Sequence, residues 1–274
     1  MRILVTGATG QVGRHLVNQL HEAGHEVRAL TRNPAKAGFP AGVQAVQGDL
    51  NDTSTLDAAF EGVEGIHLIT FGGDGFSDLT NGPEIVALAE RHGIGRATVL
   101  GGWSPTSVES ALMSSSIGWT ILQPVEFMGN ALDWADEIRT KGTVAVLAAY
   151  PSAMIHEADI ASVAATALTE EGHAGRSYPL TGPEALTPRE RTQILAEATG
   201  QNIDFAQLTE DGERDRLRGY GYDDDYVEFG IQLATNPPDA AGVVLTTVED
   251  VTGRPARTFT TWAQEQAEQF RSTP

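Results

Sequence analysis

The chain has 274 residues, and its 18 Lys and Arg against 37 Asp and Glu give a formal net charge of −19 at pH 7. Binding a polyanion requires clustered basic side chains, and an anionic membrane surface repels excess carboxylates, so we expect neither nucleic acid nor membrane as a partner. The chain has no cysteine, which removes disulfides, thiolate metal sites and cysteine nucleophiles.

No apolar run approaches the roughly 18 residues that a membrane-spanning helix needs. The N-terminus turns polar after three apolar residues, which is too short for the core of a secretory signal. We therefore expect an intracellular, cytoplasmic protein. The oligomeric state is left open, with a homo-oligomer as one alternative.

Strand-like and helix-like segments alternate from the first residues onward. Short apolar runs predict strands at residues 2–6, 26–31, 43–47, 65–70, 97–100 and 119–123. Amphipathic spacing and capping signals predict helices at residues 11–23, 53–60, 81–92 and 104–115. Parallel strands need long crossovers, so this alternation predicts a Rossmann-type α/β fold, a doubly wound parallel sheet with helices on both faces.

The alternation loosens after about residue 145. We expect helices at 159–169, 188–199 and 259–271, and strands at 177–180 and 203–208. This pattern indicates a sheet domain over residues 1–150 and a smaller C-terminal α/β lobe over residues 151–274. The lobe is expected to be interleaved with the first domain and to contain the substrate pocket. The acidic cluster 223–225 is interpreted as a solvated helix start or loop.

A glycine-rich loop joins the first expected strand to the first expected helix. Gly7 permits a tight turn, Gly10 lets the backbone approach a pyrophosphate, and Gly13 lets the helix pack closely on the sheet. The pyrophosphate would lie on the partly positive helix N-terminus. The residues expected to bind a dinucleotide here are Gly7, Thr9, Gly10, Gln11, Val12 and Gly13.

The end of the second expected strand indicates which dinucleotide binds. An NAD site usually has Asp or Glu there to accept hydrogen bonds from the ribose 2′-hydroxyl. Here the residues are Thr31 and Arg32, so a carboxylate is missing and a guanidinium suited to a 2′-phosphate is present. We expect NADP(H) to be preferred over NAD(H).

Two more strand ends are expected to face the cofactor. Asp49 and Leu50 follow the third strand and would contact the adenine, the first by a hydrogen bond and the second by packing. Thr70, Phe71 and Gly72 follow the fourth strand, where backbone groups would run beside the cofactor.

These motifs resemble those of a known family. The glycine loop, together with Arg32 and residues 48–50, resembles the NmrA-like branch of atypical short-chain dehydrogenases/reductases. Residues 118–124 and 127–130 are similar to that family's strand and pocket segment. The resemblance covers most of the chain and implies a Rossmann fold with a small C-terminal lobe, NADP(H) binding and reduction of quinones, dyes or related conjugated carbonyl compounds. Bacterial NAD(P)H:quinone oxidoreductases and triphenylmethane reductases belong to this branch, and some members are cofactor sensors.

The acid–base pair of typical short-chain dehydrogenases is missing. That pair is Tyr-x-x-x-Lys, and residues 97–140 contain neither tyrosine nor lysine. Gly101 and Gly102 stand where many relatives have two serines, and Gln123 replaces a common arginine. Hydride transfer depends mainly on orientation, so a reductase stays compatible with these departures.

Five side chains are candidates for catalysis or substrate contact. Tyr150 and His156 are nominated as proton donors, with a pocket wall and a structural histidine as their respective alternatives. Trp103, Phe127 and Met128 are expected to line an apolar pocket for a small-molecule substrate, and core packing is the alternative for Met128.

The first hypothesis for function is an NADPH-dependent reductase of a small quinone-like or conjugated carbonyl substrate. The alternative is a non-catalytic NADP(H)-binding redox sensor that acts through a protein partner, and a third is a non-redox catalyst such as an isomerase. The missing Tyr–Lys pair favours the sensor, whereas the aromatic pocket segment favours the reductase. No metal site is expected, because Gly24 should end the helix within the His-Glu-x-x-His pattern at residues 21–25.

Overall fold

The computed structural model describes residues 1–72, 77–102 and 104–271, and its main sheet has seven parallel strands. The strand order is β10-β8-β7-β4-β1-β2-β3. The strands are β1 (Arg2–Val5), β2 (Glu26–Thr31), β3 (Gln44–Gln47), β4 (Gly65–Ile69), β7 (Arg96–Leu100), β8 (Gly118–Pro124) and β10 (Arg176–Leu180). The predicted Rossmann-type sheet is confirmed.

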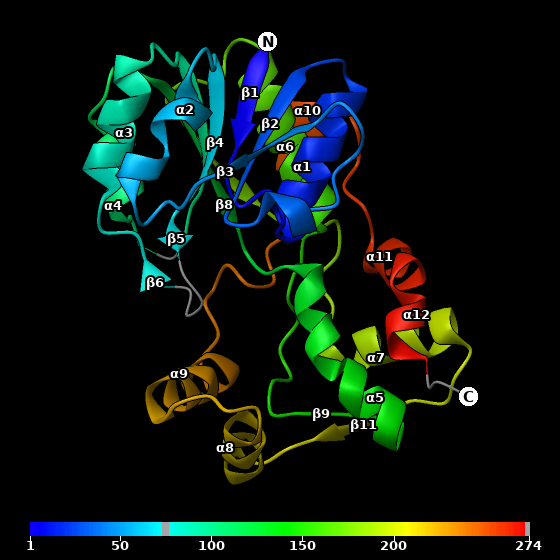
Figure 1. Cartoon of the computed structure of the whole chain (residues 1–274). Helices are drawn as coiled ribbons and strands as arrows, with labels where there is room; N and C mark the ends of the chain where they lie inside the picture. The colour runs from blue at the N-terminus through cyan, green and yellow to red at the C-terminus, as the bar shows by residue number, and fades with distance from the viewer. Residues whose placement is uncertain (73–76, 103, 272–274) are drawn as a thin grey trace. The chain divides into compact units, whose positions relative to one another are not determined.

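Helices cover both faces of this sheet. Figure 1 shows α1, α6 and α10 on one face and α2, α3 and α4 on the other. Their bounds are α1 (Gln11–Glu22), α2 (Asp57–Phe60), α3 (Gly82–Arg91), α4 (Ser107–Met113), α6 (Glu157–Thr169) and α10 (Thr247–Thr252). An apolar cluster fills the second face, with fully buried Phe60, Ile66 and Val99 among its members. The buried strands and amphipathic helices therefore form the sandwich that their periodicities predict.

Local differences from the expected elements have local causes. The helix expected from residue 104 begins at Ser107, because Thr106 caps it. The helix expected at 53–60 is a 3₁₀ turn (Thr53–Thr55) followed by the single turn of α2. A second 3₁₀ turn covers Pro34–Lys36, and a small hairpin, β5 (Phe71–Gly72) and β6 (Ser77–Asp78), was not predicted.

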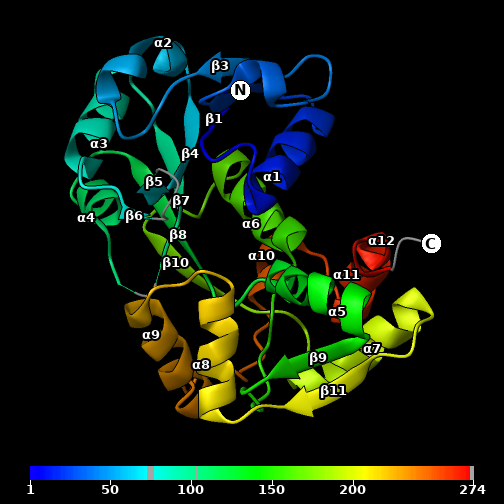
Figure 2. The ribbon, with the colours of Figure 1, turned by 60° about the horizontal axis from the view of Figure 1, so that its bottom comes forward.

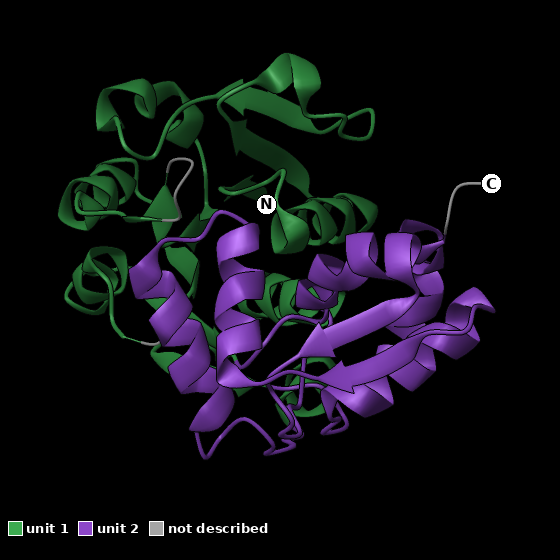
Figure 3. Ribbon diagram, turned by 90° about the horizontal axis from the view of Figure 1, so that it is seen from below, with its two compact units in different colours: residues 1–124, 157–180, 247–254 green, residues 125–156, 181–246, 255–274 purple. Residues whose placement is uncertain are grey.

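The chain divides into two compact units, coloured separately in Figure 3. The first contains residues 1–124, 157–180 and 247–254, and the second contains 125–156, 181–246 and 255–274. Residues 157–180, expected in the C-terminal lobe, belong with the sheet. The reason is that β10 pairs with β8, and Gln19 on α1 donates to the carbonyl of Ala158 on α6 at 2.9 Å. The two units are thus interleaved in sequence.

The second unit is built around its own apolar cluster. Its elements are a 3₁₀ helix (Met128–Trp134), α5 (Ala135–Lys141), β9 (Thr143–Val146), α7 (Pro188–Thr199), β11 (Asp204–Gln207), α8 (Glu210–Gly219), α9 (Asp224–Thr235), α11 (Phe259–Glu265) and α12 (Ala267–Phe270). β9 and β11 form a parallel pair, visible in Figure 2. Trp262 stacks on Phe259 at 5.3 Å between ring centroids and meets Phe270 edge-on at 6.1 Å, which fixes α11 and α12.

Sequence patterns predicted this unit less completely. β11 and α7 were expected, and Asp223 caps the start of α9, as interpreted from the acidic cluster. The helix expected at 259–271 is broken at Gln266 into α11 and α12. The elements α5, β9, α8 and α9 were not predicted.

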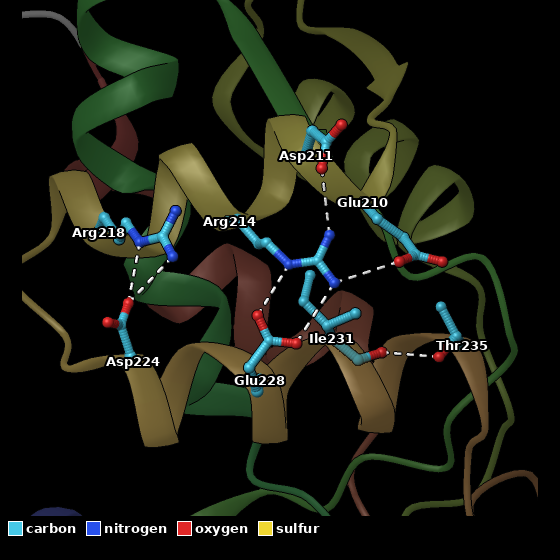
Figure 4. Close-up of polar contacts among 8 residues, drawn as sticks. All are labelled: Glu210, Asp211, Arg214, Arg218, Asp224, Glu228, Ile231 and Thr235. Atoms are coloured by element: carbon cyan, nitrogen blue, oxygen red, sulfur yellow. Dashed lines mark hydrogen bonds and ion pairs between the residues drawn. The ribbon is translucent and has the colours of Figure 1, made fainter.

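Ion pairs link α8 to α9. Figure 4 shows Arg214 of α8 between Asp211, Glu210 and Glu228, the last at 2.8 Å from its Nε. Arg218 pairs with Asp224 at 3.0 Å. The carboxylates in these pairs are exposed, so each pair contributes little to stability.

Candidate functional site

The strand order reverses at β1, which makes the carboxyl end of β1 the switch point of the sheet. From β1 the chain runs outward through β2 and β3, and then returns to β4 on the other side of β1. Ligands of open α/β sheets bind in the crevice outside the carboxyl ends of the strands at such a point. The glycine-rich loop leaves β1 here.

Two glycines of this loop are required by its geometry. Gly7 has φ +58°, a left-handed conformation, and a Cβ there would lie 2.8 Å from Cγ2 of Ile69. A Cβ on Gly13 would lie 2.1 Å from the carbonyl oxygen of Gly7 and 2.8 Å from Cα of Ala8. Since both of the latter contacts are with backbone, a side chain at position 13 must push helix and loop apart.

The N-terminus of α1 is left without a side-chain cap. Gly10 is its N-cap residue, and the first turn holds no acidic side chain. By contrast, in the described ranges five α-helices have N-cap side chains that accept a backbone N–H: Thr106, Thr187, Thr209, Asp223 and Thr258. The first N–H groups of α1 and its positive end suit an external anion. The loop therefore fits a dinucleotide pyrophosphate.

The end of β2 presents cations rather than carboxylates. Arg32 is exposed there, after the half-buried Thr31. Arg14, which sequence reasoning missed, donates to the carbonyls of Thr9 and Ala37, each at 3.1 Å. It thereby ties the glycine loop to the segment after β2. The only sequence signal for Arg14 is its position directly after Gly13, on the first turn of α1.

Asp49 and Leu50 lie after β3, and their side chains face different surroundings. Oδ1 of Asp49 accepts from the backbone N–H of Asn51 at 2.9 Å and from its side-chain amide at 3.1 Å. Leu50 is 6% exposed and belongs to the apolar cluster of the first unit. Its carbonyl accepts from Nδ2 of Asn81 at 2.8 Å. The predicted adenine contact through the Leu50 side chain thus competes with core packing.

The end of β4 lies beside the end of β7. Thr70 is buried, its hydroxyl lies 3.4 Å from the carbonyl oxygen of Leu100, and its own carbonyl accepts from the N–H of Leu79 at 2.8 Å. Phe71 and Gly72 are half-buried and form β5. These residues stand at the carboxyl edge of the sheet, where the sequence placed them.

The two nominated proton donors lie in the second unit and differ in environment. Tyr150 is half-buried. Burial raises its pKa, Glu126 raises it further, and Arg191 opposes both effects. His156 is 1% exposed, and its Nε2 lies 3.1 Å from Oε2 of Glu265 on α11. The pKa of the phenol is therefore held above its ordinary value, whereas the imidazole is buried with its Nε2 against the Glu265 carboxylate.

The residues expected to line the substrate pocket also differ in environment. Phe127 is half-buried and forms an isolated parallel β-bridge with Ile155. Met128 is 0% exposed within the apolar cluster of the second unit, which is the core alternative. Trp103 lies outside the described residues.

Arg191 on α7 is a buried cation that sequence reasoning missed. Its Nη1 lies 3.6 Å from Oε1 of Glu126 and also contacts the sulfur of Met154, and its guanidinium lies 5.5 Å from the centroid of the Trp134 ring. Burial lowers its pKa, opposed by Glu126 and Tyr150. No local sequence signal marks such a residue, because burial of an arginine depends on the elements around it.

Two negative findings apply to the part of the chain that the structure describes. It contains no group of three or more His, Asp or Glu that could hold a metal ion. It also contains no helix that is long and apolar enough to cross a membrane. α1 ends at Glu22, so His21 and His25 do not share a helix.

The fold and the glycine loop define a Rossmann-type NAD(P)H-binding protein, and comparisons with known proteins agree. A family model described as NAD(P)H-binding matches residues 7–105. The (4-alkanoyl-5-oxo-2,5-dihydrofuran-3-yl)methyl phosphate reductase of Streptomyces griseus is 37% identical, over 98% of this chain and 99% of that protein. The NAD(P)H azoreductase of Xenophilus azovorans is 35% identical over the same shares. The chain belongs to the NAD(P)H-binding family, with reductases among its relatives.

Solved structures share the whole fold. The NADPH complex of an Escherichia coli NADPH-dependent quinone oxidoreductase has a TM-score of 0.81 at 24% identity, covering 96% of this chain and 99% of that one. NmrA, a negative transcriptional regulator solved with NADP, has a TM-score of 0.72 at 18% identity, covering 96% and 94%. At these identities the likeness shows the fold alone.

Proposed function

We propose that the chain is an NADPH-dependent reductase of a small quinone-like or conjugated carbonyl compound. The observation that carries the proposal is the uncapped N-terminus of α1 at the switch point of the sheet. Support also comes from two relatives that match nearly the whole chain and are reductases, one of a dihydrofuranone phosphate and one of azo compounds.

The cofactor is assigned to the first unit. The amides of Gln11, Val12 and Gly13 would hold the pyrophosphate, and Asp49 would contact the adenosine half. Bound NADPH supplies the hydride, so the protein's own task is to orient the nicotinamide and the acceptor.

We assign the preference for NADP(H) to Arg32, with Arg14 as its neighbour in the same half of the site. A guanidinium forms charge-assisted, bidentate hydrogen bonds with a phosphate, whereas a ribose hydroxyl at that place prefers a carboxylate acceptor. Residues 31–33, Thr-Arg-Asn, supply no carboxylate.

For the proton, Tyr150 fits the task of a donor better than His156. Its phenol is half-buried, and burial and Glu126 raise its pKa, so that it keeps its proton until one is needed. His156 is committed to Glu265, so we assign it to stabilisation of the second unit. Tyr150→Phe should lower turnover and leave NADPH affinity unchanged.

The missing Tyr-x-x-x-Lys pair favours the second candidate function, a sensor of NADP(H) redox state, and one experiment separates the two. NADPH and NADP⁺ are titrated by calorimetry, and NADPH oxidation is then followed against a panel of quinones and enones. Turnover of any panel member supports the reductase. Tight binding that differs between the two redox forms, without turnover, supports the sensor, and failure to bind either form removes the cofactor assignment.

A further inference from the structure

Glu109 is a buried carboxylate at the carboxyl end of β7. It belongs to a capping box on α4, in which Thr106 and Glu109 satisfy each other's backbone groups. A second capping box, Thr187 and Glu190, begins α7. Glu190 is exposed, whereas Glu109 is only 3% exposed. A capping role does not require that burial, because the box on α7 forms at the surface.

Only one oxygen of the Glu109 carboxylate is used by the cap. Oε2 accepts from the N–H of Thr106 at 2.9 Å. In the described part of the chain no donor reaches Oε1, and the sole fully enclosed polar side-chain atom without a partner is Nε of Arg191. Oε1 is therefore an unused acceptor that keeps an opening to its surroundings.

Gly101 packs against this oxygen. A Cβ at position 101 would lie 2.7 Å from Oε1 of Glu109 and 3.0 Å from Cγ2 of Ile121. The glycine is not required by the backbone there, because Gly101 does not have a positive φ. Its lack of a side chain instead makes room for Oε1 of Glu109 beside the backbone that follows β7.

The position of this carboxylate matches one half of a dinucleotide. The order reversal at β1 places one nucleotide half over β2 and β3 and the other over β4 and β7. Arg32 ends β2, so the adenosine half belongs on that side. The nicotinamide half then lies towards β7. The end of β7 is joined there to the end of β4 by the Thr70 hydroxyl, which lies at the carbonyl of Leu100, and to β8 by the N–H of Gly101, which donates to the carbonyl of Leu122. The carboxamide NH₂ of the nicotinamide carries two donors and needs acceptors.

We propose that Glu109, through its unused Oε1, accepts a hydrogen bond from the carboxamide of the bound nicotinamide and so sets the orientation of the ring. The proposal rests on the cofactor placement under "Proposed function". It gives this chain a side-chain anchor for the nicotinamide in a region that lacks the Tyr–Lys pair.

The test compares NADP⁺ with 2′-phospho-ADP-ribose, which lacks the nicotinamide, by calorimetry on the full chain. In Glu109→Gln the amide oxygen keeps the cap, since Gln also forms capping boxes, and the NH₂ group replaces Oε1. The NH₂ group of the variant side chain then faces the NH₂ group of the carboxamide, and no hydrogen bond can form between the two donors. We expect at least a tenfold loss of NADP⁺ affinity and less than a twofold change for 2′-phospho-ADP-ribose. Glu190→Gln in the exposed box is the matched control and should alter neither affinity.

A second variant changes the surroundings of Oε1 without altering Glu109 itself. The Cβ of Gly101→Ser would displace Oε1 and should give the same selective loss, with the unfolding transition as the check on folding. Equal losses for both ligands would mean that Glu109 is only structural and would overturn the proposal, as would unchanged NADP⁺ affinity in both variants. If the unaltered protein binds 2′-phospho-ADP-ribose but gains nothing from the nicotinamide, the proposal fails while the adenosine site stands. Failure to bind either ligand overturns both.

Discussion

Helix α1 of the first unit and helix α7 of the second begin in opposite ways. α7 starts with a capping box, Thr187 and Glu190, and has Pro188 in its first turn, so the protein itself satisfies the helix end. α1 starts at Gly10 with no side-chain cap and no acidic residue in its first turn. α1 thus lacks the cap that α7 has, as α2, α3, α5 and α12 also do, and its first N–H groups stay available for the pyrophosphate that we propose there.

The stability that α1 forgoes is recovered by packing. A missing cap costs about 1 kcal/mol, whereas burying a single large aliphatic side chain contributes about 1.5–3 kcal/mol. α1 buries Val12, Leu16, Val17 and Leu20. A helix that is anchored in this way tolerates an uncapped N-terminus. Variants at the start of α1 or of α7 can test this contrast.

The largest effect is expected from Gly13→Val. The added Cβ would meet the backbone of Gly7 and Ala8, so the loop must separate from α1. We expect loss of measurable NADPH binding in calorimetry and a fall of roughly 1–3 kcal/mol in the free energy of unfolding in urea. Gly95→Ala is the control, because a Cβ there meets nothing within 4 Å and should change neither measurement. Retained binding would show that the loop does not hold the cofactor.

Gly10→Asp would convert the start of α1 into the kind of cap that α9 has. Gly10 has φ −77° and ψ 177°, which suits an Asp cap, so the free energy of unfolding should stay within a few tenths of a kcal/mol or rise. The carboxylate would occupy the anion site, and NADPH affinity should fall by about 2–3 kcal/mol. Unchanged affinity in calorimetry would contradict the assignment of the pyrophosphate to this helix end.

Arg32→Ala tests the adenosine end of the proposed cofactor site. Loss of a charge-assisted hydrogen bond to the 2′-phosphate should weaken NADPH binding by roughly 1–3 kcal/mol and leave NADH binding nearly unchanged. Paired titrations of the two nucleotides measure this directly. Equal losses for both would show that Arg32 does not select NADP(H).

Thr187→Ala breaks the closed helix end in the second unit. Removal of the cap should lower the free energy of unfolding by about 1 kcal/mol in urea titration, because the N–H of Glu190 loses its acceptor. NADPH affinity should not change, since the cofactor is assigned to the other unit. A loss of affinity as large as that in Gly10→Asp would contradict this assignment.

The smallest effect is a pH dependence of the same cap. Hydrogen bonds from the backbone and side chain of Thr187 hold the pKa of Glu190 below its usual 4.5. A lowered pKa means that the stabilisation is present above pH 4.5 and is lost as the pH falls through the folded-state value. Glu190→Gln should therefore flatten the acid limb of stability slightly, measured by thermal unfolding between pH 3 and 6. A steeper limb in the variant would contradict the sign.

Much of the first unit could be predicted from the sequence, because its signals are local. The strands β1, β2, β4 and β7 are short and largely buried runs, and the glycine loop follows the first of them directly. The return of α6 and β10 to the sheet could not be predicted, since their periodicity would suit either unit. The elements α8 and α9 escaped prediction because their apolar stripes are narrow, with Leu217, Val227 and Ile231 as their buried large apolar residues.

The candidate site divides in the same way. Gly7, Gly10 and Gly13 are recognisable in sequence, because a tight turn and a close approach place demands on single residues. In the sequence, Glu109 can be recognised only as part of a capping box. Its burial follows from the packing of α4 at the ends of β7 and β8.

The sequence was therefore enough to predict the strand–helix alternation, the glycine-rich start of α1 and the arginine at the end of β2, because each depends on neighbours along the chain. Only the tertiary structure decided that Met128 is core and that His156 pairs with Glu265, 109 residues away. It also decided that Gly101 lies against one oxygen of Glu109. Such contacts join residues that are distant in sequence, and burial and electrostatic surroundings are set by the neighbours that folding brings together.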